Sequence, residues 1–392
     1  MARQPPPTEK PQPMTTAEME EAIERFNTRV DGAIAASPPS KERVRRAVRR
    51  QGSPRCPVRM RRLSFDVILR HGDALADLFC EFPDDTVFLT AYDVFLGYQP
   101  PERTDRISPV EALMHTARWT DEWGTTWGHT QGGVGASPFA HPLHDWGQLN
   151  DYLRSKVPDP LAPGRLDAVR APLEMHGKTK YCVANIHLAL FERMHVLRGM
   201  QNAFADFYTN ENEVHRLLDA LTDYLIALTR SWAAAGVDAV FYTDDFGTQK
   251  SLMISPAMWR NFFKEPYRRL FAEAHGLGLD VILHSCGNVM GIVPDLIDVG
   301  LDMLDPLQPG AMDMDELGRR FGGQLAFCGG VDIQDLLPFG SPQEVKDAVR
   351  RLIDTLGRPF GNSLIVAPAN TVTPEVPLEN FRALFEACHE GR

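Results

Sequence analysis

Ala239-Val-Phe-Tyr-Thr243 and Asp280-Val-Ile-Leu-His284 are two short apolar runs, and a longer amphipathic run, residues 256–276, lies between them. Short apolar runs rich in β-branched and aromatic residues are typical of buried strands, whereas an amphipathic run of more than about ten residues is typical of a helix. The stretch therefore predicts a strand, a helix and a second strand, which is the repeating unit of a parallel α/β fold.

The same alternation continues along most of the chain, with further helices predicted over residues 211–235 and 341–357. Eight such repeats favour a closed barrel over an open sheet. We therefore predict a single (β/α)8 TIM barrel over residues 53–392, in which chemistry is expected at the carboxyl ends of the strands. The predicted strands are residues 56–60, 86–90, 181–185, 239–243, 280–284, 303–305, 325–328 and 363–367.

Two regions depart from this pattern. Within residues 1–52, the first dozen residues are rich in proline and charge and predict a disordered tail, whereas residues 14–50 predict a helical extension. Its basic part, residues 41–50, is expected to be a solvated helix face, with an interaction arm as the alternative. Residues 100–170 are rich in Trp, Gly, His and Pro with weak periodicity, which predicts a loop-rich insertion or lid beside the barrel mouth.

Composition excludes several classes of function. The 392 residues carry 41 basic and 52 acidic side chains, a formal net charge of -11, which disfavours binding to nucleic acid or to an anionic membrane. Without an apolar run of membrane-spanning length or a signal-peptide pattern, the protein is expected in the cytoplasm. Six scattered cysteines indicate reduced thiols or metal ligands rather than a disulfide framework. A homodimer is the default expectation.

His284-Ser-Cys-Gly-Asn288 ends the predicted strand of residues 280–284. Side chains two residues apart on a strand point the same way, so the imidazole of His284 and the thiol of Cys286 can hold one zinc ion. The alternative is a buried histidine and a small buried thiol that serve packing alone. A zinc site needs three or four ligands, so any others must come from distant parts of the chain.

Four further candidates for catalysis or metal binding lie at or just after the ends of predicted strands. Asp244 and Asp245 alternate in direction, so at most one points into the site while the other can cap the following helix or orient a neighbour. Cys328 precedes two glycines and is a candidate third metal ligand, although a core position is equally consistent with its place. Asp93 is an acid in an apolar setting, which is either capped by backbone amides or held for catalysis.

Candidate substrate-binding residues lie near the same strand ends. Arg61 and Arg62 follow the first predicted strand and can pair with substrate carboxylates, although surface placement is the commoner outcome. Gln308 and Asn370 follow later strands. His187 belongs to the same set but is expected to be structural rather than a metal ligand.

Five stretches together resemble the uroporphyrinogen decarboxylase superfamily, which includes haem-pathway decarboxylases and zinc-dependent methyltransferases that act with corrinoid proteins. The resemblance extends from about Ser53 to the C-terminus and implies one TIM barrel. The stretches are Ala235-Gly-Val-Asp-Ala-Val-Phe-Tyr-Thr-Asp-Asp-Phe-Gly247, Pro266-Tyr267, His284-Ser-Cys-Gly287, Gly329-Gly-Val-Asp332 and Pro374-Glu-Val-Pro-Leu-Glu-Asn380.

In the methyltransferase branch, His284 and Cys286 resemble the first two zinc ligands, and the zinc activates a thiol as thiolate for methyl transfer. That branch has its third ligand, a cysteine, near the last strand. Asn370 stands at that place here, and asparagine is a poor zinc ligand. The resemblance implies that Cys328 or Asp245 substitutes, or that the site holds no zinc in the usual manner.

In the decarboxylase branch, Asp93 falls where the substrate-orienting acid would lie. The arginine-rich motif of that branch is reduced to Met60-Arg-Arg-Leu63, which offers few basic residues for an eight-carboxylate substrate. We therefore predict methyl transfer involving a corrinoid or a small methylated substrate. The first alternative is decarboxylation of a porphyrinogen or smaller acid, and the second is a barrel without catalysis that binds a partner such as a corrinoid protein.

Overall fold

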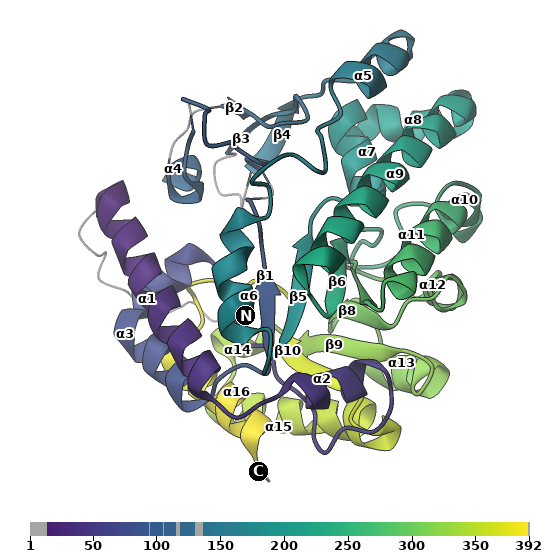
Figure 1. Ribbon diagram of the computed structural model, residues 1–392. Helices are drawn as coiled ribbons and strands as arrows, with labels where there is room; N and C mark the ends of the chain where they lie inside the picture. Colours follow the sequence, from purple (N-terminus) through teal and green to yellow (C-terminus); the bar gives the residue numbers. More distant parts are fainter. Residues whose placement is uncertain (1–13, 94, 105, 115–117, 130–135, 391–392) are drawn as a thin grey trace.

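The computed structural model describes residues 14–93, 95–104, 106–114, 118–129 and 136–390. Its centre is a seven-stranded parallel sheet that curls into a TIM-like half-barrel, with helices on its outer face (Figure 1). The predicted parallel α/β alternation is confirmed. The strands, in their order across the sheet, are β1 (Thr86–Leu89), β5 (Tyr181–Ile186), β6 (Ala239–Thr243), β7 (Asp280–His284), β8 (Met303–Leu307), β9 (Ala326–Val331) and β10 (Leu364–Pro368).

The first predicted strand, residues 56–60, is an isolated bridge rather than a strand of the sheet. Val58 bridges Val366 of β10 in parallel, and on its other side the Val58 carbonyl accepts from the amide of Asp85 at 3.0 Å. The carboxylate of Asp85 accepts from the amide of Val58, and that of Asp84 accepts from the amide of Met60. On the side of Asp84 and Asp85, side-chain hydrogen bonds thus take the place of most backbone hydrogen bonds of a strand ladder. The segment in this way joins the two edges of the curled sheet.

Helices α3 and α6 to α16 lie between and after the strands and cover the outer face of the sheet. The predicted helix of residues 256–276 is divided at Phe263 into two helices, and Ser255 caps the first of them through the amide of Met258. The helices are α3 (Phe65–Glu81), α6 (Arg170–His176), α7 (Phe191–Arg198), α8 (Met200–Thr209), α9 (Glu211–Ala235), α10 (Pro256–Phe262), α11 (Lys264–Gly276), α12 (Val293–Asp298), α13 (Met314–Phe321), α14 (Leu336–Phe339), α15 (Pro342–Leu352) and α16 (Leu378–His389).

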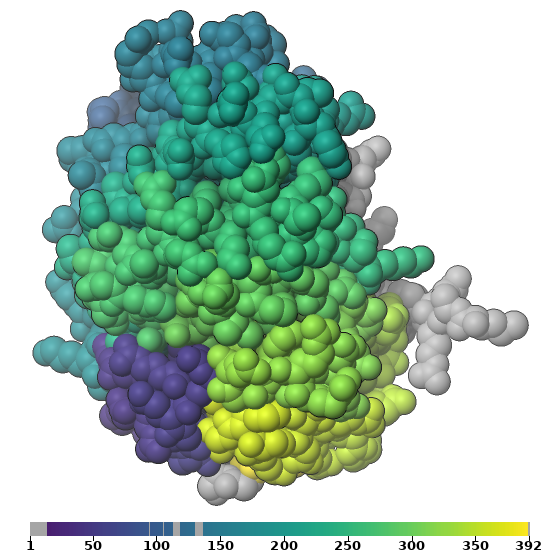
Figure 2. Space-filling view, turned by 90° about the vertical axis from the view of Figure 1, so that its right-hand side faces the viewer, coloured from purple at the N-terminus to yellow at the C-terminus, as the bar shows by residue number. Residues whose placement is uncertain are grey.

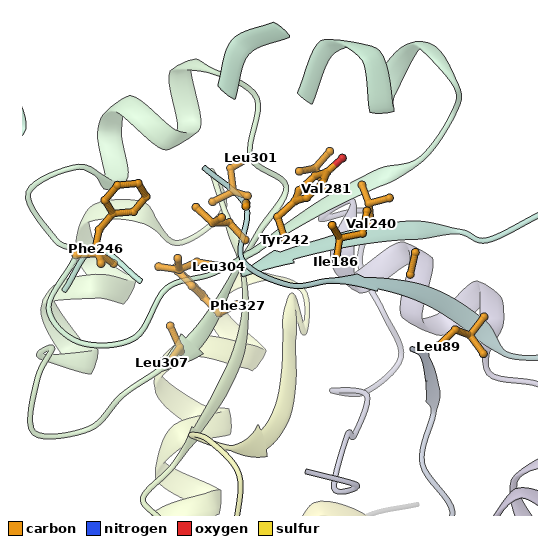
Figure 3. Packing of buried hydrophobic residues seen from close by; sticks show 14 of the residues in the cluster. Leu89, Ile186, Val240, Tyr242, Phe246, Val281, Leu301, Leu304, Leu307 and Phe327 are labelled. Carbon is orange, nitrogen blue, oxygen red and sulfur yellow. The ribbon is translucent and has the colours of Figure 1, made fainter. Parts of the chain in front are cut away.

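Both faces of the sheet are buried, which explains why its strands are continuous apolar runs. Figure 3 shows one face, where side chains such as Val240, Val281 and Leu304 pack toward the helices. Alternate residues, among them Phe241 and Ile282, form a second cluster inside the curl of the sheet. The interior is therefore filled with side chains and leaves the chemistry to the strand ends.

The N-terminal extension consists of α1 (Thr16–Ala36), which packs on α3, and α2 (Lys41–Val48). The expectation of a solvated face or an interaction arm is wrong for α2. Val44 and Val48 are buried with the interior cluster, and Arg45 pairs with Asp238 at 2.9 Å. Helix α2 closes the amino-terminal end of the sheet, and Figure 2 shows the purple N-terminal segment packed beside the C-terminal residues. The predicted tail, residues 1–13, lies outside the described residues.

The insertion predicted over residues 100–170 contains more regular structure than expected. It forms α4 (Pro109–Met114), α5 (Leu149–Ser155) and a small antiparallel sheet. In Figure 1, α5 lies near the outer ends of α7 and α9, whereas α4 lies on the other side of the small sheet, near α1. The strands of this sheet are β2 (Trp119–Thr120), β3 (Thr126–His129) and β4 (Ala136–Ala140).

Among the helices of the described ranges, none combines the length and the apolar character needed to cross a membrane.

Candidate active site

Asp245, His284 and Cys286 come together at the carboxyl ends of β6 and β7. The Cys286 Sγ lies 3.3 Å from the His284 Nε2, which lies 3.7 Å from the Asp245 Oδ1. One potential ligand atom from each residue lies within 4.8 Å of the others. The amide of Cys286 donates to the Asp245 Oδ1 at 2.8 Å, which ties the two strand ends to each other. Nitrogen, sulfur and oxygen donors therefore face one point, and we call these three residues the metal cluster.

Two glycines bring the loops of the metal cluster together. A Cβ on Gly247 would lie 2.5 Å from the Cys286 carbonyl oxygen, and a Cβ on Gly287 would lie 2.5 Å from the backbone of Gly247. Gly287 also has a φ of 80°, in the left-handed region that favours glycine. Only glycine allows the two backbones to approach this closely, so these residues set the distance between Asp245 and Cys286.

Asp305, a fully buried residue of β8, contacts the ring nitrogen of His284 that faces away from Cys286 and Asp245. The Asp305 Oδ1 lies 2.6 Å from the His284 Nδ1, and its carboxylate also accepts from Arg62 at 2.9 Å and from Arg59 at 3.3 Å. Burial would raise the pKa of Asp305, but Arg62, His284 and Arg59 hold it well below its usual range. Since a carboxylate only accepts, the His284 Nδ1 carries the proton and Nε2 is left to face Cys286 and Asp245.

Asn370 and Gln308 both contact the turn that carries Cys286. The Asn370 Nδ2 donates to the Cys286 Sγ at 3.1 Å, and the Gln308 Oε1 accepts from the amide of Gly287 at 2.9 Å. Burial, Asp245 and Asp305 raise the pKa of the Cys286 thiol well above its usual range. Without a cation the sulfur is therefore a protonated thiol, and a bound metal ion would reverse this.

The two aspartates after β6 have different roles. Asp244 is fully buried, and its carboxylate accepts from the amides of Phe191 at 2.9 Å and Glu192 at 2.6 Å and from the hydroxyl of Tyr267. Burial raises the pKa of Asp244 to about 6 against these hydrogen bonds. Asp244 thus caps α7 and is a positioning residue, and only Asp245 enters the metal cluster.

Cys328 and His187 lie near the centre without entering the cluster. Within the described residues, the group of potential metal ligands does not include Cys328, which faces the barrel interior. Its pKa is raised by burial and by Asp305. Burial and the nearby charges of His284 and Arg59 lower the pKa of His187 to about 4, so this imidazole is neutral at pH 7. The structure therefore presents Asp245 rather than Cys328 as the third potential ligand.

The remaining predicted residues lie farther from the cluster or are already paired. Arg61 points to α1, where it pairs with Asp31 and donates to Asn27. The Arg62 guanidinium is buried against Asp305. One oxygen of Asp93 accepts from the amides of two residues that follow it, at 2.8 and 3.0 Å, and burial raises its pKa. Backbone amides thus cap Asp93, which is one of the two outcomes that the sequence allowed.

Three residues of the site were missed in the sequence. Asp305 had a detectable signal, because it is an acid inside the apolar run of β8 and such an acid needs partners. For Arg59 the sequence contains no such signal beyond its place in the first predicted strand. Glu192 is partly buried and accepts from the Thr243 hydroxyl at 3.2 Å, and its pKa is raised well above its usual range by desolvation, Asp245 and Asp244. Its nearness to Asp245 could not be inferred from positions 53 residues apart.

Comparisons with known proteins identify the family of the chain. The family described as uroporphyrinogen decarboxylase (URO-D) matches residues 145–391. A methylated-thiol–coenzyme M methyltransferase of Methanosarcina mazei is 28% identical over 194 residues, which are 50% of this chain and 49% of that protein. A uroporphyrinogen decarboxylase of Pseudomonas fluorescens is 27% identical over 193 residues, 49% of this chain and 52% of that protein. The chain thus matches about half the length of these curated relatives.

A solved structure of a methyltransferase from Methanosarcina mazei has the same fold. It superimposes with a TM-score of 0.65 and 18% sequence identity, and the match covers 90% of this chain and 99% of that chain. At this identity the likeness establishes the fold alone.

Proposed function

The chain belongs to the uroporphyrinogen decarboxylase family, and from that premise we propose that this family enzyme transfers a methyl group to a small thiol at a zinc centre held by Asp245, His284 and Cys286. The single observation that carries the proposal is the metal cluster, in which three different donor atoms lie within 4.8 Å of one another. Similarity to a methylated-thiol methyltransferase over half of the chain supports the same reading.

The donor set fits zinc. Catalytic zinc sites use three protein ligands and keep a fourth position for substrate. The Asp245 carboxylate carries one negative charge, as does the cysteine thiolate that the family resemblance expects as the third ligand. Replacing that thiolate with Asp245 therefore leaves the total charge of the ligands unchanged. The Asp305 contact behind His284 is the kind of outer hydrogen bond that orients a zinc-bound imidazole.

When bound, zinc lowers the pKa of a coordinated substrate thiol and makes it nucleophilic at neutral pH. The chain supplies the geometry. Asp305 holds the His284 ring in one tautomer, and the amide of Cys286 holds the Asp245 Oδ1 in place. The Asn370 Nδ2 directs a hydrogen bond at the Cys286 Sγ, which orients that sulfur while leaving it free to bind the ion.

We assign the rest of the chain around this centre. Residues 14–52 form an extension that closes the amino-terminal end, residues from 53 onward form one (β/α)8 barrel closed through Val58, and the described part of residues 100–170 forms a lid. The contact of Arg193, of α7, over the Trp123 ring at 4.5 Å supports the place of the lid near the barrel mouth. The methyl donor is a methylated corrinoid, carried by a partner protein or free, or a small methylated molecule.

Decarboxylation of a porphyrinogen is the less favoured function. An eight-carboxylate substrate needs free basic side chains. Both arginines that could serve are already paired, Arg61 with Asp31 and Arg62 with Asp305. A barrel without catalysis is disfavoured for another reason, because buried charged groups such as Asp305 are costly to retain in a pure scaffold.

Metal analysis of the purified protein tests the proposal. We expect about one zinc per chain in the wild type, loss of zinc in Cys286→Ser, and retention in the matched control Cys328→Ser. Methyl transfer from methylcobalamin to a small thiol, followed by mass spectrometry, should depend on the same residues. Carbon dioxide release that survives chelators but is abolished by Asp93→Ala would instead identify a decarboxylase.

A further inference from the structure

Arg59 is buried inside the curl of the sheet, next to the metal cluster. Its guanidinium carbon lies 3.3 Å from the centre of the Phe88 ring and 5.2 Å from the centre of the Phe241 ring. The Phe241 ring also contacts the His284 ring, with 5.6 Å between their centres. The two phenylalanine rings hold the guanidinium in one place, so a fixed positive charge lies close to a residue of the metal cluster.

The buried charges at this place do not balance. Arg59 and Arg62 each carry one positive charge, and both pair with the carboxylate of Asp305, at 3.3 and 2.9 Å. In the described part of the chain, no other acid forms an ion pair with either arginine. Two guanidinium groups therefore share one carboxylate, and these three side chains together carry one net positive charge.

The other ionisable side chains nearby do not offset this charge. The His187 imidazole is neutral at pH 7, because desolvation and nearby positive charges, that of Arg59 among them, lower its pKa to about 4. The Cys328 thiol stays protonated, because burial raises its pKa. Desolvation and the neighbouring acids raise the pKa of Glu192 well above its usual range, which favours its neutral form. Arg59 itself stays charged at pH 7, although burial and the charge of Arg62 lower its pKa to about 10.

The proposed zinc centre leaves the net positive charge without a partner until substrate binds. A zinc ion carries two positive charges, which the carboxylate of Asp245 and the thiolate of Cys286 offset. The charge of the two arginines and Asp305 then remains. A ligand with one negative charge in the position left for substrate offsets it, and a thiolate is such a ligand, whereas a thiol is not.

We infer that Arg59 is a positioning residue that makes the centre bind the substrate sulfur as a thiolate, an inference that rests on the proposed function. Arg59 acts through Asp305, which its Nη1 contacts at 3.3 Å and which orients His284. It also acts through the field of its charge, which water does not screen in the barrel interior. As the sulfur enters the position left for substrate, its S–H bond breaks and the proton leaves to solvent.

The full chain with cobalt(II) in place of zinc tests this role, because a thiolate bound to cobalt(II) adds a charge-transfer band in the near ultraviolet. The probe is 2-mercaptoethanol, a thiol without any other charge, and the pH midpoint of the added band measures how readily its thiolate forms. We expect Arg59→Met to raise this midpoint by about 1 pH unit, which is about a tenfold loss of thiolate binding. Arg59→Lys keeps a positive charge and should restore most of the loss.

Arg198→Met is the matched control. Arg198 is also buried, lies 4.1 Å from the centre of the Trp146 ring and pairs with Asp206, but it stands at the far end of α7. Its loss leaves Asp206 without a cation, so the urea unfolding midpoint should fall while the thiolate midpoint stays unchanged. Arg59→Met should do the opposite, because it leaves one arginine paired with one aspartate. A purely structural role for Arg59 would move only the urea midpoint.

An NMR titration of His187 without added metal tests the charge of Arg59 by itself. Since that charge helps to lower the pKa of His187, Arg59→Met should raise this pKa and Arg198→Met should not. An unchanged His187 pKa in Arg59→Met, or a thiolate band with the same midpoint in wild type and Arg59→Met, would overturn this inference while the proposed function stands. A wild type that binds cobalt(II) but shows no added thiolate band would overturn both.

Discussion

The Asn370 side chain donates a hydrogen bond to the Cys286 thiol, with 3.1 Å between Nδ2 and Sγ. Asn370 follows β10, at the place where the family resemblance expects the third zinc ligand, a cysteine, and the two residues meet although 84 positions separate them. The asparagine is thus within reach of the metal cluster but contributes a hydrogen-bond donor there. Asp245, on the other side of Cys286, supplies the third potential ligand atom.

Asn370→Cys should add a fourth protein ligand to the proposed zinc centre. A second thiolate is a stronger zinc ligand than an amide, so we expect zinc affinity to rise at least about tenfold, measured by competition with a chromogenic chelator. Because the added ligand takes the position left for substrate, methyl transfer should fall. Asn370→Ala controls for loss of the hydrogen bond alone. Equal zinc affinity in Asn370→Cys and Asn370→Ala would contradict the assignment of this position.

Asp305→Asn should weaken both the fold and the metal site. The change removes the buried negative charge that compensates Arg62 and Arg59, and breaking such a group costs about 3–5 kcal/mol. It also removes the acceptor that orients His284, which should lower zinc affinity by about 10- to 100-fold. Urea denaturation and chelator competition measure the two effects. Asp298→Asn, on an exposed side chain, is the control and should change neither.

Asp305 also predicts a pH dependence of stability. Its pKa is lower in the folded protein than in the unfolded chain, so the unfolded chain takes up its proton first as the pH falls. The stability that its ionised form contributes is fully present above the unfolded pKa of about 4 and is lost progressively below it. The difference in unfolding free energy between wild type and Asp305→Asn should therefore be constant from pH 5 to 7, a range that begins about 1 pH unit above the unfolded pKa. The difference should shrink in stronger acid. A difference that grows on acidification would refute this.

His187 predicts a second pH dependence, in a higher range. Burial, His284 and Arg59 lower its pKa to about 4, against about 6.5 in an unfolded chain. Between these values the unfolded chain binds the proton and the folded protein does not, so stability falls as the pH drops from about 6.5 to 4. His187→Gln cannot titrate and should flatten this part of the curve, as measured by urea denaturation at each pH. Parallel curves for wild type and variant would show that His187 is not buried as a neutral imidazole.

Gly247→Ala tests the backbone contact that builds the metal cluster. The added Cβ would lie 2.5 Å from the Cys286 carbonyl oxygen, so the loops after β6 and β7 must separate. We expect a loss of about 1–3 kcal/mol in unfolding free energy, together with loss of bound zinc. At Gly236 the φ of 96° is strained for alanine, but a Cβ there meets nothing within 4 Å. Gly236→Ala should therefore cost stability and keep its zinc, and zinc loss in both variants would count against the proposed role of Gly247.

The sequence by itself determined the parallel α/β alternation and the strand that carries His284 and Cys286. Both depend on local pattern, namely short apolar runs between amphipathic ones and the two-residue period of a strand. The same period placed His284 and Cys286 on one side of β7, and it allowed only one of Asp244 and Asp245 to face the site. The cap that Asp244 forms differs from the expected one, because it lies on α7, which precedes β6 in the chain, and not on the helix that follows.

Only the tertiary structure decided which of these residues meet. The choice of Asp245 over Cys328 depends on strand register and on the close approach at Gly247 and Gly287, neither of which has a local signal. Asp305, Arg59 and Glu192 reach the centre from three separate segments. The two edges of the curled sheet are joined by side-chain hydrogen bonds of Asp84 and Asp85 in place of backbone ladder bonds, and sequence periodicity does not register such bonds. Distances across a barrel are set by packing between segments far apart in the chain, and that information exists only once the chain has folded.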